Sequence, residues 1–250
     1  MVLYNNITIK NNRGGRKTNK QKKKNKRTKK KQILRKNYNH IFFNSMKEYI
    51  KNISNNQYEF AVHEAGGGGD CLFHSIAAGL EIANSIPKIK ENRKLTAKDL
   101  RKIVSDSILE WDEKKFKEYI EIARISKLYG EWSDRWDPNY VTNKQILSKV
   151  FSIMGNIHWG TDFDISILSD KLEVGIIVFQ ANIRDARIYC IPSENKKKKY
   201  YMFIYNNGGH YQLAGIKKIK STKYQSVLLP KDIPMFLKTE YKKLCNSEII

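Results

Sequence analysis

The sequence has few cysteines and no long apolar run. Its 250 residues include three cysteines, Cys71, Cys190 and Cys245, an odd number at wide spacings. This favours free thiols in a reducing compartment over a disulfide framework, and nothing resembles a zinc ligand set. No stretch approaches the roughly 20 apolar residues of a membrane-spanning helix, and the N-terminus lacks the apolar segment of an export signal. We therefore expect an intracellular protein, cytoplasmic or nuclear, without a membrane partner.

Acidic residues are missing before Glu48, and this places much of the positive charge at one end. Fifteen Lys and Arg residues lie between residues 10 and 36, so only +7 of the formal net charge of +22 belongs to the rest. Dense like charge with few apolar residues predicts a disordered basic tail over residues 1–40. Its run KKKNKRTKKK, residues 22–31, leaves three interpretations open: a site for an import receptor, an arm that binds nucleic acid, or a solubilising tail.

The rest of the chain is rich enough in apolar residues for one folded domain, which we place at residues 41–220. Residues 221–250 form a C-terminal extension whose structure the pattern leaves open. Apolar spacing predicts helices over residues 41–50, 71–83, 96–108, 113–128, 142–153 and 163–172. Strand patterns follow at residues 175–180, 186–192, 199–206 and 210–216. This order favours an α+β fold with a helical lobe packed on a small, mainly antiparallel sheet.

The segment AGGGGDCLFHSIAAGL, residues 65–80, carries the most chemical information. Four glycines and Asp70 lead into an amphipathic helix that begins at Cys71. Unpaired N–H groups and the helix dipole stabilise a thiolate at such a start, and amides near Gly68, Gly69 and Cys71 can converge on an oxyanion. Taken alone, a buried structural cysteine is the simpler interpretation. A phosphate-binding loop is excluded because no Lys-Ser or Lys-Thr follows the glycines.

A thiol nucleophile needs a general base, and the chain offers five histidines. His210 lies in YNNGGHYQLAG, where a Gly-containing turn leads into a predicted strand that would hold the ring at the edge of a rigid element. His74, three residues after Cys71, fits either the surface or the core side of its helix. Spacing alone does not choose among the histidines.

Three motifs, in order, resemble those of the ovarian-tumour (OTU) family of cysteine proteases and deubiquitinases. GGDCLFHSI (68–76) resembles the family's nucleophile motif, HWGTDFDISILSDKLEVGIIVF (158–179) its middle motif, and GGHYQLA (208–214) its terminal His-aromatic motif. The resemblance covers roughly residues 58–216. The Lys-rich and Asn-rich composition is also similar to that of such proteases from large DNA viruses.

The resemblance implies a papain-like OTU fold and hydrolysis of ubiquitin isopeptide bonds, with ubiquitin or polyubiquitin as partner and with no metal or cofactor. It implies that Cys71 is the nucleophile and that His210 is its general base. The residues implied around the substrate are Gly68, Gly69 and Asp70 in the oxyanion loop and Tyr211 in the wall. Trp159 and Gly160 are predicted to be architectural, with the indole packed between helices and sheet.

Two departures from the family pattern leave the third catalytic residue open. Gly68 stands where an acid usually precedes the cysteine by three residues, and Gln212 stands where Asp or Asn commonly follows the histidine by two. We assign Gln212 as the orienter of His210, because its amide oxygen can accept the ring N–H. Asn206 and Asn207 are alternatives, although turn formation is their simpler role.

Two other functions stay open. The departures at Gly68 and Gln212 would suit a catalytically weak ubiquitin-binding module. The basic tail would suit a nucleic-acid-binding protein in which residues 1–40 are the functional part.

Overall fold

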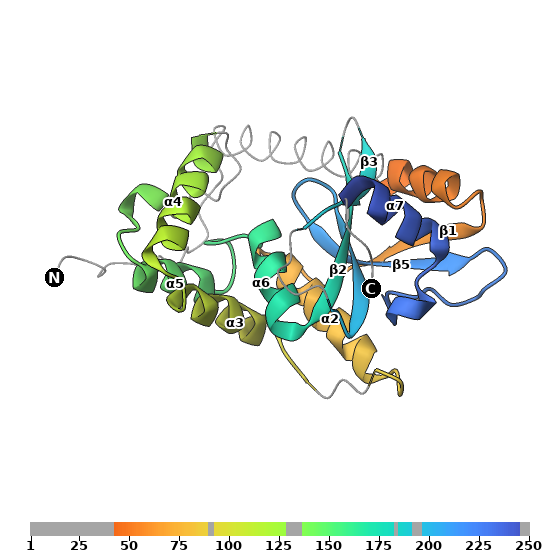
Figure 1. Ribbon diagram of the computed structural model, residues 1–250, viewed down its shortest axis with the longest axis horizontal. Coiled ribbons are helices and arrows are strands. Elements are labelled where there is room, and N and C mark those ends of the chain that lie inside the picture. Colours follow the sequence, from red (N-terminus) through yellow and green to blue (C-terminus); the bar gives the residue numbers. More distant parts are fainter. Residues whose placement is uncertain (1–42, 90–92, 129–136, 183–184, 192–196, 246–250) are drawn as a thin grey trace, which may run out of the picture. The chain divides into compact units, whose positions relative to one another are not determined.

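A mixed β-sheet lies at the centre of the fold (Figure 1). The computed structural model describes residues 43–89, 93–128, 137–182, 185–191 and 197–245. Its strands are β1 (Tyr58–His63), β2 (Val174–Ala181), β3 (Ala186–Tyr189), β4 (Tyr200–Asn206), β5 (Tyr211–Lys218) and β6 (Val227–Leu228). The strand order is β1-β5-β4-β2-β3, and β6 pairs with β4. The described pairs are antiparallel except β2 with β4, so the sheet is mainly antiparallel, as predicted, around a parallel centre.

Helices cover both faces of this sheet. They are α2 (Cys71–Asn84), α3 (Ala97–Leu109), α4 (Glu113–Leu128), α5 (Lys144–Ser152), α6 (Asp162–Leu172), α7 (Met235–Cys245) and a helix over residues 43–53, with short 3-10 turns at η1 (Pro138–Tyr140) and η2 (Pro230–Asp232). Figure 1 shows α2 and α6 beside one face of the sheet, and α7 and the orange helix 43–53 beside the other. The predicted α+β class is confirmed.

The interior strand β2, which lies between β4 and β3, is buried on both faces, and this explains its continuous apolar sequence. Successive side chains of a strand point to opposite faces. Ile176 and Val178 pack into the hydrophobic core shared with α2, α3 and α6, while Ile177 and Phe179 pack into the core shared with helix 43–53 and α7. Full burial of such a side chain contributes about 1.5–3 kcal/mol. The two cores fix the sheet against the helices on either side of it.

Most predicted helices and strands are present with small shifts at their ends. Thr96 and Asp99 form the capping box expected at the start of α3. The prediction missed β1, although the apolar residues of YEFAVH alternate and the segment lies between Asn55-Asn56 and the glycine run that begins at Gly66. It also left residues 221–250 unplaced, and 221–245 include β6, η2 and α7.

The prediction of three free thiols is wrong. Cys190, which follows β3, and Cys245, which ends α7, form a disulfide with their Cα atoms 5.4 Å apart. Their proximity arises because α7 packs against β3, a contact between distant segments that no local pattern reveals. Cys71 is a free cysteine.

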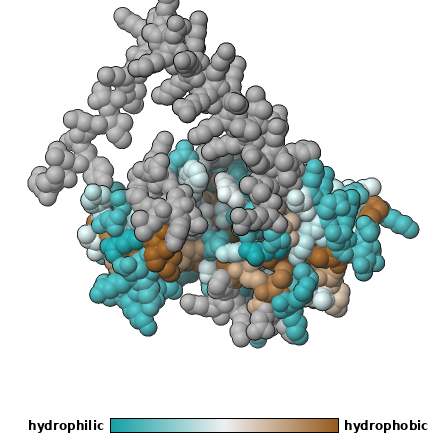
Figure 2. Space-filling view, turned by 90° about the horizontal axis from the view of Figure 1, so that it is seen from above, coloured by the Kyte–Doolittle hydropathy of each residue, from teal (hydrophilic) through white to brown (hydrophobic). Residues whose placement is uncertain are grey.

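The predicted basic tail lies outside the described residues, so its disorder stays a prediction. The described residues belong to one unit, Ile41–Ile250. Hydrophilic residues cover much of its described surface in the view of Figure 2. None of the described helices combines the length and apolar character needed to cross a membrane.

Candidate active site

Cys71 is the first residue of α2, and its thiol lies against the start of β5. Its Sγ accepts a 3.4 Å hydrogen bond from the backbone N–H of Tyr211, and the residue is only 9% exposed. A helix start supplies unpaired N–H groups and the positive end of the helix dipole, both of which favour a thiolate. The local setting is therefore the one that the sequence predicted for a nucleophile.

His210 stands immediately before β5, and the packing of β5 on α2 brings it to Cys71 from 139 positions away in the sequence. Its pKa is raised from 6.5 to about 9, first by a hydrogen bond with Cys71. Burial acts in the opposite direction, and a hydrogen bond with Glu64 adds to the rise. The ring of His210 therefore holds its proton more strongly than a free imidazole does.

A carboxylate that the sequence analysis did not nominate contacts the His210 ring. Glu64 Oε1 lies 2.8 Å from Nε2 of His210, and Gln212 Nε2 donates a 2.9 Å hydrogen bond to Glu64 Oε2. In these contacts, Glu64 binds the ring of His210, and the side-chain amide of Gln212 binds Glu64. This corrects the prediction that Gln212 orients His210 directly.

The asparagines before His210 shape the turn. Asn206 Oδ1 accepts a 2.8 Å hydrogen bond from the N–H of Gly208, and the Asn207 N–H donates to the carbonyl oxygen of His210 at 3.3 Å. Gly208 has a φ of +86°, a conformation that glycine adopts without strain. These two asparagines therefore have the simpler role that the sequence suggested, which is to present His210 at the start of β5.

The glycine-rich loop before Cys71 approaches a second loop very closely. Gly69 has a φ of +97°, and a Cβ at this position would lie 2.3 Å from the carbonyl oxygen of Gly155. Glycine is therefore required there both by conformation and by space. Gly68 also has a positive φ, +73°, but a Cβ there would meet open space. The loop thus enters α2 through a tight turn, and its service as an oxyanion loop stays a prediction.

The side chain of Asp70 is anchored to the interior of the protein. Its Oδ1 lies 2.5 Å from Nε of Arg101, and its Oδ2 accepts a 2.6 Å hydrogen bond from the N–H of Gly155. Asp70 occupies the N-cap position of α2 without making a side-chain cap hydrogen bond. Both carboxylate oxygens of Asp70 are therefore engaged within the protein. These contacts hold the backbone of the predicted oxyanion loop in place.

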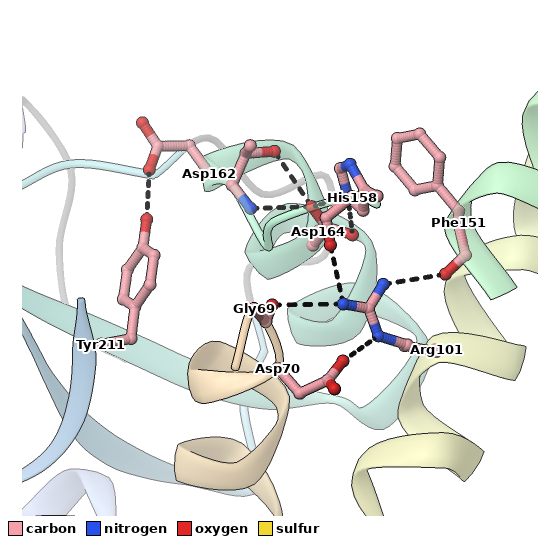
Figure 3. A network of polar contacts seen from close by, with 9 residues as sticks. Gly69, Asp70, Arg101, Phe151, His158, Asp162, Asp164 and Tyr211 are labelled. Carbon is pink, nitrogen blue, oxygen red and sulfur yellow. Dashed lines mark hydrogen bonds and ion pairs between the residues drawn. The ribbon is translucent and has the colours of Figure 1, made fainter. Parts of the chain in front are cut away.

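Arg101 is the centre of the polar network drawn in Figure 3. Its side chain is fully buried, and besides Asp70 it donates to three backbone carbonyl oxygens, those of Gly69 at 3.2 Å, Phe151 at 3.1 Å and His158 at 2.7 Å. A buried guanidinium is stable only when its donors are satisfied in this way. Arg101 thereby ties the loop before the nucleophile to the end of α5 and to the segment before α6.

The sequence analysis missed Arg101, although one signal was available. Arg101 lies on the apolar stripe of α3 with Ala97, Val104 and Ile108, all of which are buried. A cation on the apolar face of a helix predicts a buried partner, because an unpaired buried charge is very costly. The sequence contains many acids, however, and gives no means of selecting Asp70 among them.

Tyr211, which was predicted to wall the substrate site, contacts Cys71 through its backbone N–H, and its role toward a substrate stays a prediction. Its ring is buried, and its hydroxyl donates to Asp162 Oδ1 at 3.4 Å, as Figure 3 shows. Burial raises the pKa of Asp162 and of Tyr211, so both groups favour their neutral forms more than they would in water. The phenol thus contacts the first residue of α6, while the backbone N–H of the same residue contacts the Cys71 sulfur.

The motif around Trp159 and Gly160 is architectural only in part. A Cβ on Gly160 would lie 2.5 Å from Cδ2 of Leu72, so this glycine permits close packing against α2. Asp164 completes the capping box with Thr161 and contacts the ring of buried His158. The indole of Trp159, in contrast, is 46% exposed, and the prediction that it packs between helices and sheet is wrong.

The described residues contain no group of three or more His, Cys, Asp or Glu side chains that could hold a metal ion.

Comparison with known proteins yields one family and several solved structures. The family model described as OTU-like cysteine protease matches residues 66–211. An OTU domain solved in complex with ubiquitin is 20% identical, with 74% of this chain and 83% of that chain covered at a TM-score of 0.47. An OTU deubiquitinase from Wolbachia pipientis wMel is also 20% identical, with 62% and 87% covered at a TM-score of 0.40. The viral OTU domain protease from Dera Ghazi Khan virus is 15% identical, with 64% and 82% covered at 0.37. A comparison with curated proteins found no match.

Proposed function

Because this chain belongs to the family of OTU-like cysteine proteases, we propose that it is a thiol-dependent deubiquitinase that hydrolyses ubiquitin isopeptide bonds. Its α+β papain-like fold is the fold of that family. The observation that carries the proposal is the meeting of Cys71, at a helix start, with His210, whose raised pKa reflects a hydrogen bond with the thiol first of all.

The proposed reaction begins with attack of the Cys71 sulfur on the carbonyl carbon of the terminal glycine of ubiquitin. The thiol proton resides on His210, and the carbonyl electron pair moves to oxygen in a tetrahedral intermediate. When the intermediate collapses, the C–N bond to the lysine breaks and His210 gives its proton to the leaving amine. Water, deprotonated by His210, then cleaves the thioester and releases ubiquitin with a free carboxylate.

Stabilisation of the oxyanion is assigned to backbone amides at the start of α2. The N–H of Cys71 is the first of the helix, where such groups have no partner within the helix itself. The loop that contains Gly69 is held next to it by Arg101, so the amide dipoles need no reorganisation during the reaction. Asp70 and Arg101 contribute by fixing this geometry and do not contact the reacting atoms in this proposal.

The test is reaction of the purified full chain with ubiquitin that carries a thiol-reactive group at its C-terminus. We expect a covalent adduct with the parent, none with Cys71→Ala, and much slower formation with His210→Ala, because only the parent retains both the nucleophile and its base. If a folded parent forms no adduct, the ubiquitin-directed activity proposed here is wrong. Binding of ubiquitin without an adduct would then favour the weak ubiquitin-binding module that the departures at Gly68 and Gln212 suggested.

We propose a separate role for residues 1–40, which is binding of a polyanion such as nucleic acid or recognition by an import receptor. The support is the sequence alone, with 15 cations between residues 10 and 36. Deletion of residues 1–36 should abolish retention on heparin at moderate salt while leaving the rate of adduct formation at Cys71 unchanged. Loss of both properties would instead tie the tail to the active site.

An intracellular location, cytoplasmic or nuclear, is part of the proposal, since the conjugates to be cleaved are made inside cells. Disulfides are rare in those compartments, so the Cys190–Cys245 pair offers a direct test. Trapping of thiols in intact cells should find this pair largely reduced if the location is correct. A fully oxidised pair in cells would count against it.

A further inference from the structure

The acid that contacts His210 precedes the nucleophile in the sequence. Glu64 directly follows β1, seven residues before Cys71, and its Oε1 lies 2.8 Å from Nε2 of His210. One ring nitrogen is thereby held by the carboxylate, which leaves the other ring nitrogen for Cys71. Cys71 and Glu64 both raise the pKa of this ring, Cys71 the more strongly.

The sheet explains why Glu64 reaches this position. β1 pairs with β5 in antiparallel register, and the last pair before the site is His63 with Leu213. One residue further along this register, Glu64 faces Gln212, as expected for cross-strand neighbours. Gln212 Nε2 donates to Oε2 of Glu64 at 2.9 Å, which leaves Oε1 for the histidine. Both oxygens of the carboxylate are therefore fixed by groups from the His210 end of β5.

We propose that Glu64 is the positioning acid of this site and that Gln212 holds it in place for His210. The inference rests on the proposed function. The OTU pattern commonly gives this role to an Asp or Asn two residues after the histidine. In this chain the role falls to Glu64, which precedes the nucleophile. Glu64 then compensates for the missing Asp or Asn at position 212. Instead of accepting the N–H of the histidine ring, Gln212 donates a hydrogen bond that holds Glu64 on the neighbouring strand side of the site.

Charge favours Glu64 over Gln212 for this role. A carboxylate accepts the ring N–H, selects the tautomer that faces the thiol, and stabilises the imidazolium, whereas a neutral amide oxygen can only accept the hydrogen bond. The groups that act on the His210 pKa are Cys71 from α2 and Glu64 from the end of β1. The Glu64 side chain is 58% exposed and that of His210 29% exposed, so water screens the pair and its effect is smaller than that of a buried triad.

The test compares Glu64→Gln with Glu59→Gln, a matched change on the same strand. Glu59 pairs with Lys217 and Tyr224 instead of with the site, so it controls for loss of a β1 carboxylate. Three quantities are measured on the full chain: the His210 pKa by NMR titration, the rate of Cys71 alkylation by iodoacetamide against pH, and the rate of adduct formation with reactive ubiquitin. We expect Glu64→Gln to lower the His210 pKa and to slow both reactions about tenfold or more near neutral pH, and Glu59→Gln to leave all three unchanged.

A second-site change tests the compensation. Glu64→Gln combined with Gln212→Asp returns the acid to the usual place of the family pattern, two residues after His210, and should recover most of the lost rate and of the raised pKa. A merely structural role of Glu64 would not be repaired by an acid on β5. Gln212→Ala alone should slow the reactions less than Glu64→Gln, because it loosens the carboxylate but leaves it in place.

The outcomes separate this inference from the proposed function. If Glu64→Gln matches Glu59→Gln in His210 pKa and in alkylation rate, Glu64 is not the positioning acid, whatever happens with ubiquitin. If Glu64→Gln lowers the pKa and slows alkylation while neither parent nor variant reacts with ubiquitin, the positioning role stands and the deubiquitinase proposal fails.

Discussion

Asp70, the residue immediately before the proposed nucleophile, forms a 2.5 Å ion pair with Arg101, whose side chain is completely buried. The pair joins the loop that enters α2 to the middle of α3, and the same guanidinium binds the carbonyl oxygen of Gly69. Rigidity of the loop therefore depends on a residue 30 positions after Cys71 that does not touch the thiol. Such support is what keeps backbone donors aligned when charge develops during a reaction.

Replacement of Arg101 by Met should destabilise the fold strongly. It removes the cation and leaves the Asp70 carboxylate buried without its partner, a change that typically costs about 3–5 kcal/mol. The measurement is urea unfolding of the full chain. Lys102→Ala is the control, since Lys102 forms an exposed pair with Asp106 and should change the free energy of unfolding by less than about 1 kcal/mol.

The double variant Asp70→Asn with Arg101→Met refines this test. Because it removes the orphaned charge as well, it should be more stable than Arg101→Met alone. Equal losses in Arg101→Met and Lys102→Ala would show that the buried network does not support the loop.

Gly69→Ala should slow the reaction of Cys71 with reactive ubiquitin, whereas Gly67→Ala should not. A methyl group at Gly69 would lie 2.3 Å from the carbonyl oxygen of Gly155, while one at Gly67 meets nothing within 4 Å. Gly69 also has a φ of +97°, which costs a residue with a Cβ roughly 1–2 kcal/mol. The two variants are compared by the rate of adduct formation and by thermal unfolding. Equal rates would mean that the tight approach of the two loops is unimportant for the thiol.

The parts of the site that the sequence predicted are those encoded by local patterns. Cys71 follows a glycine run at the start of an apolar helix, and His210 follows a turn that leads into a strand. The resemblance of these two short segments to the OTU motifs singled out both residues. The parts that it missed depend on pairing between distant segments. Glu64 reaches His210 only through the register of β1 with β5, and Arg101 reaches Asp70 only through the packing of α3 on α2.

The same reason accounts for the errors in the fold. The helices were predicted well because their apolar spacing is local, as in α4, whose bounds of residues 113–128 agree with the prediction. Other features depend on segments that are distant in the sequence. Examples are the parallel pairing of β2 with β4 and the disulfide that joins α7 to the segment after β3. The exposure of Trp159 is a third example of an error with this cause. A large aromatic residue is usually buried, and whether this one is covered depends on which distant segments pack around it.

Cys190→Ser should lower the free energy of unfolding of the oxidised protein by about 2–4 kcal/mol, because the disulfide closes a long loop and restricts the unfolded chain. The bridge joins residues 55 positions apart. Reductant should lower the stability of the parent to that of the variant and have no effect on the variant. The comparison is made by denaturant unfolding with and without reductant. A parent that is insensitive to reductant, with both thiols free by mass spectrometry, would contradict the bridge.

The His210 charge should make stability depend on pH in a defined direction. Its pKa in the folded protein is about 9, above the 6.5 of an unperturbed histidine, chiefly because of the hydrogen bond with Cys71. A group whose pKa rises on folding binds its proton more tightly in the folded state, so its contribution is fully present below pH 6.5 and disappears as the pH rises through 9. The difference in unfolding free energy between the parent and His210→Gln should therefore be largest at pH 6 and shrink by pH 9.5.

Urea unfolding of both proteins at several pH values measures this difference directly, and Cys71→Ser provides the control. Serine keeps the shape of the side chain but removes the acidic thiol, so the variant should show a lower His210 pKa by NMR and a correspondingly weaker dependence of stability on pH. A difference between parent and His210→Gln that stays constant from pH 6 to 9.5 would mean that the imidazole does not carry the charge assigned to it. The proposed pairing of thiolate with imidazolium would then have to be abandoned in favour of a neutral thiol that His210 deprotonates only during attack.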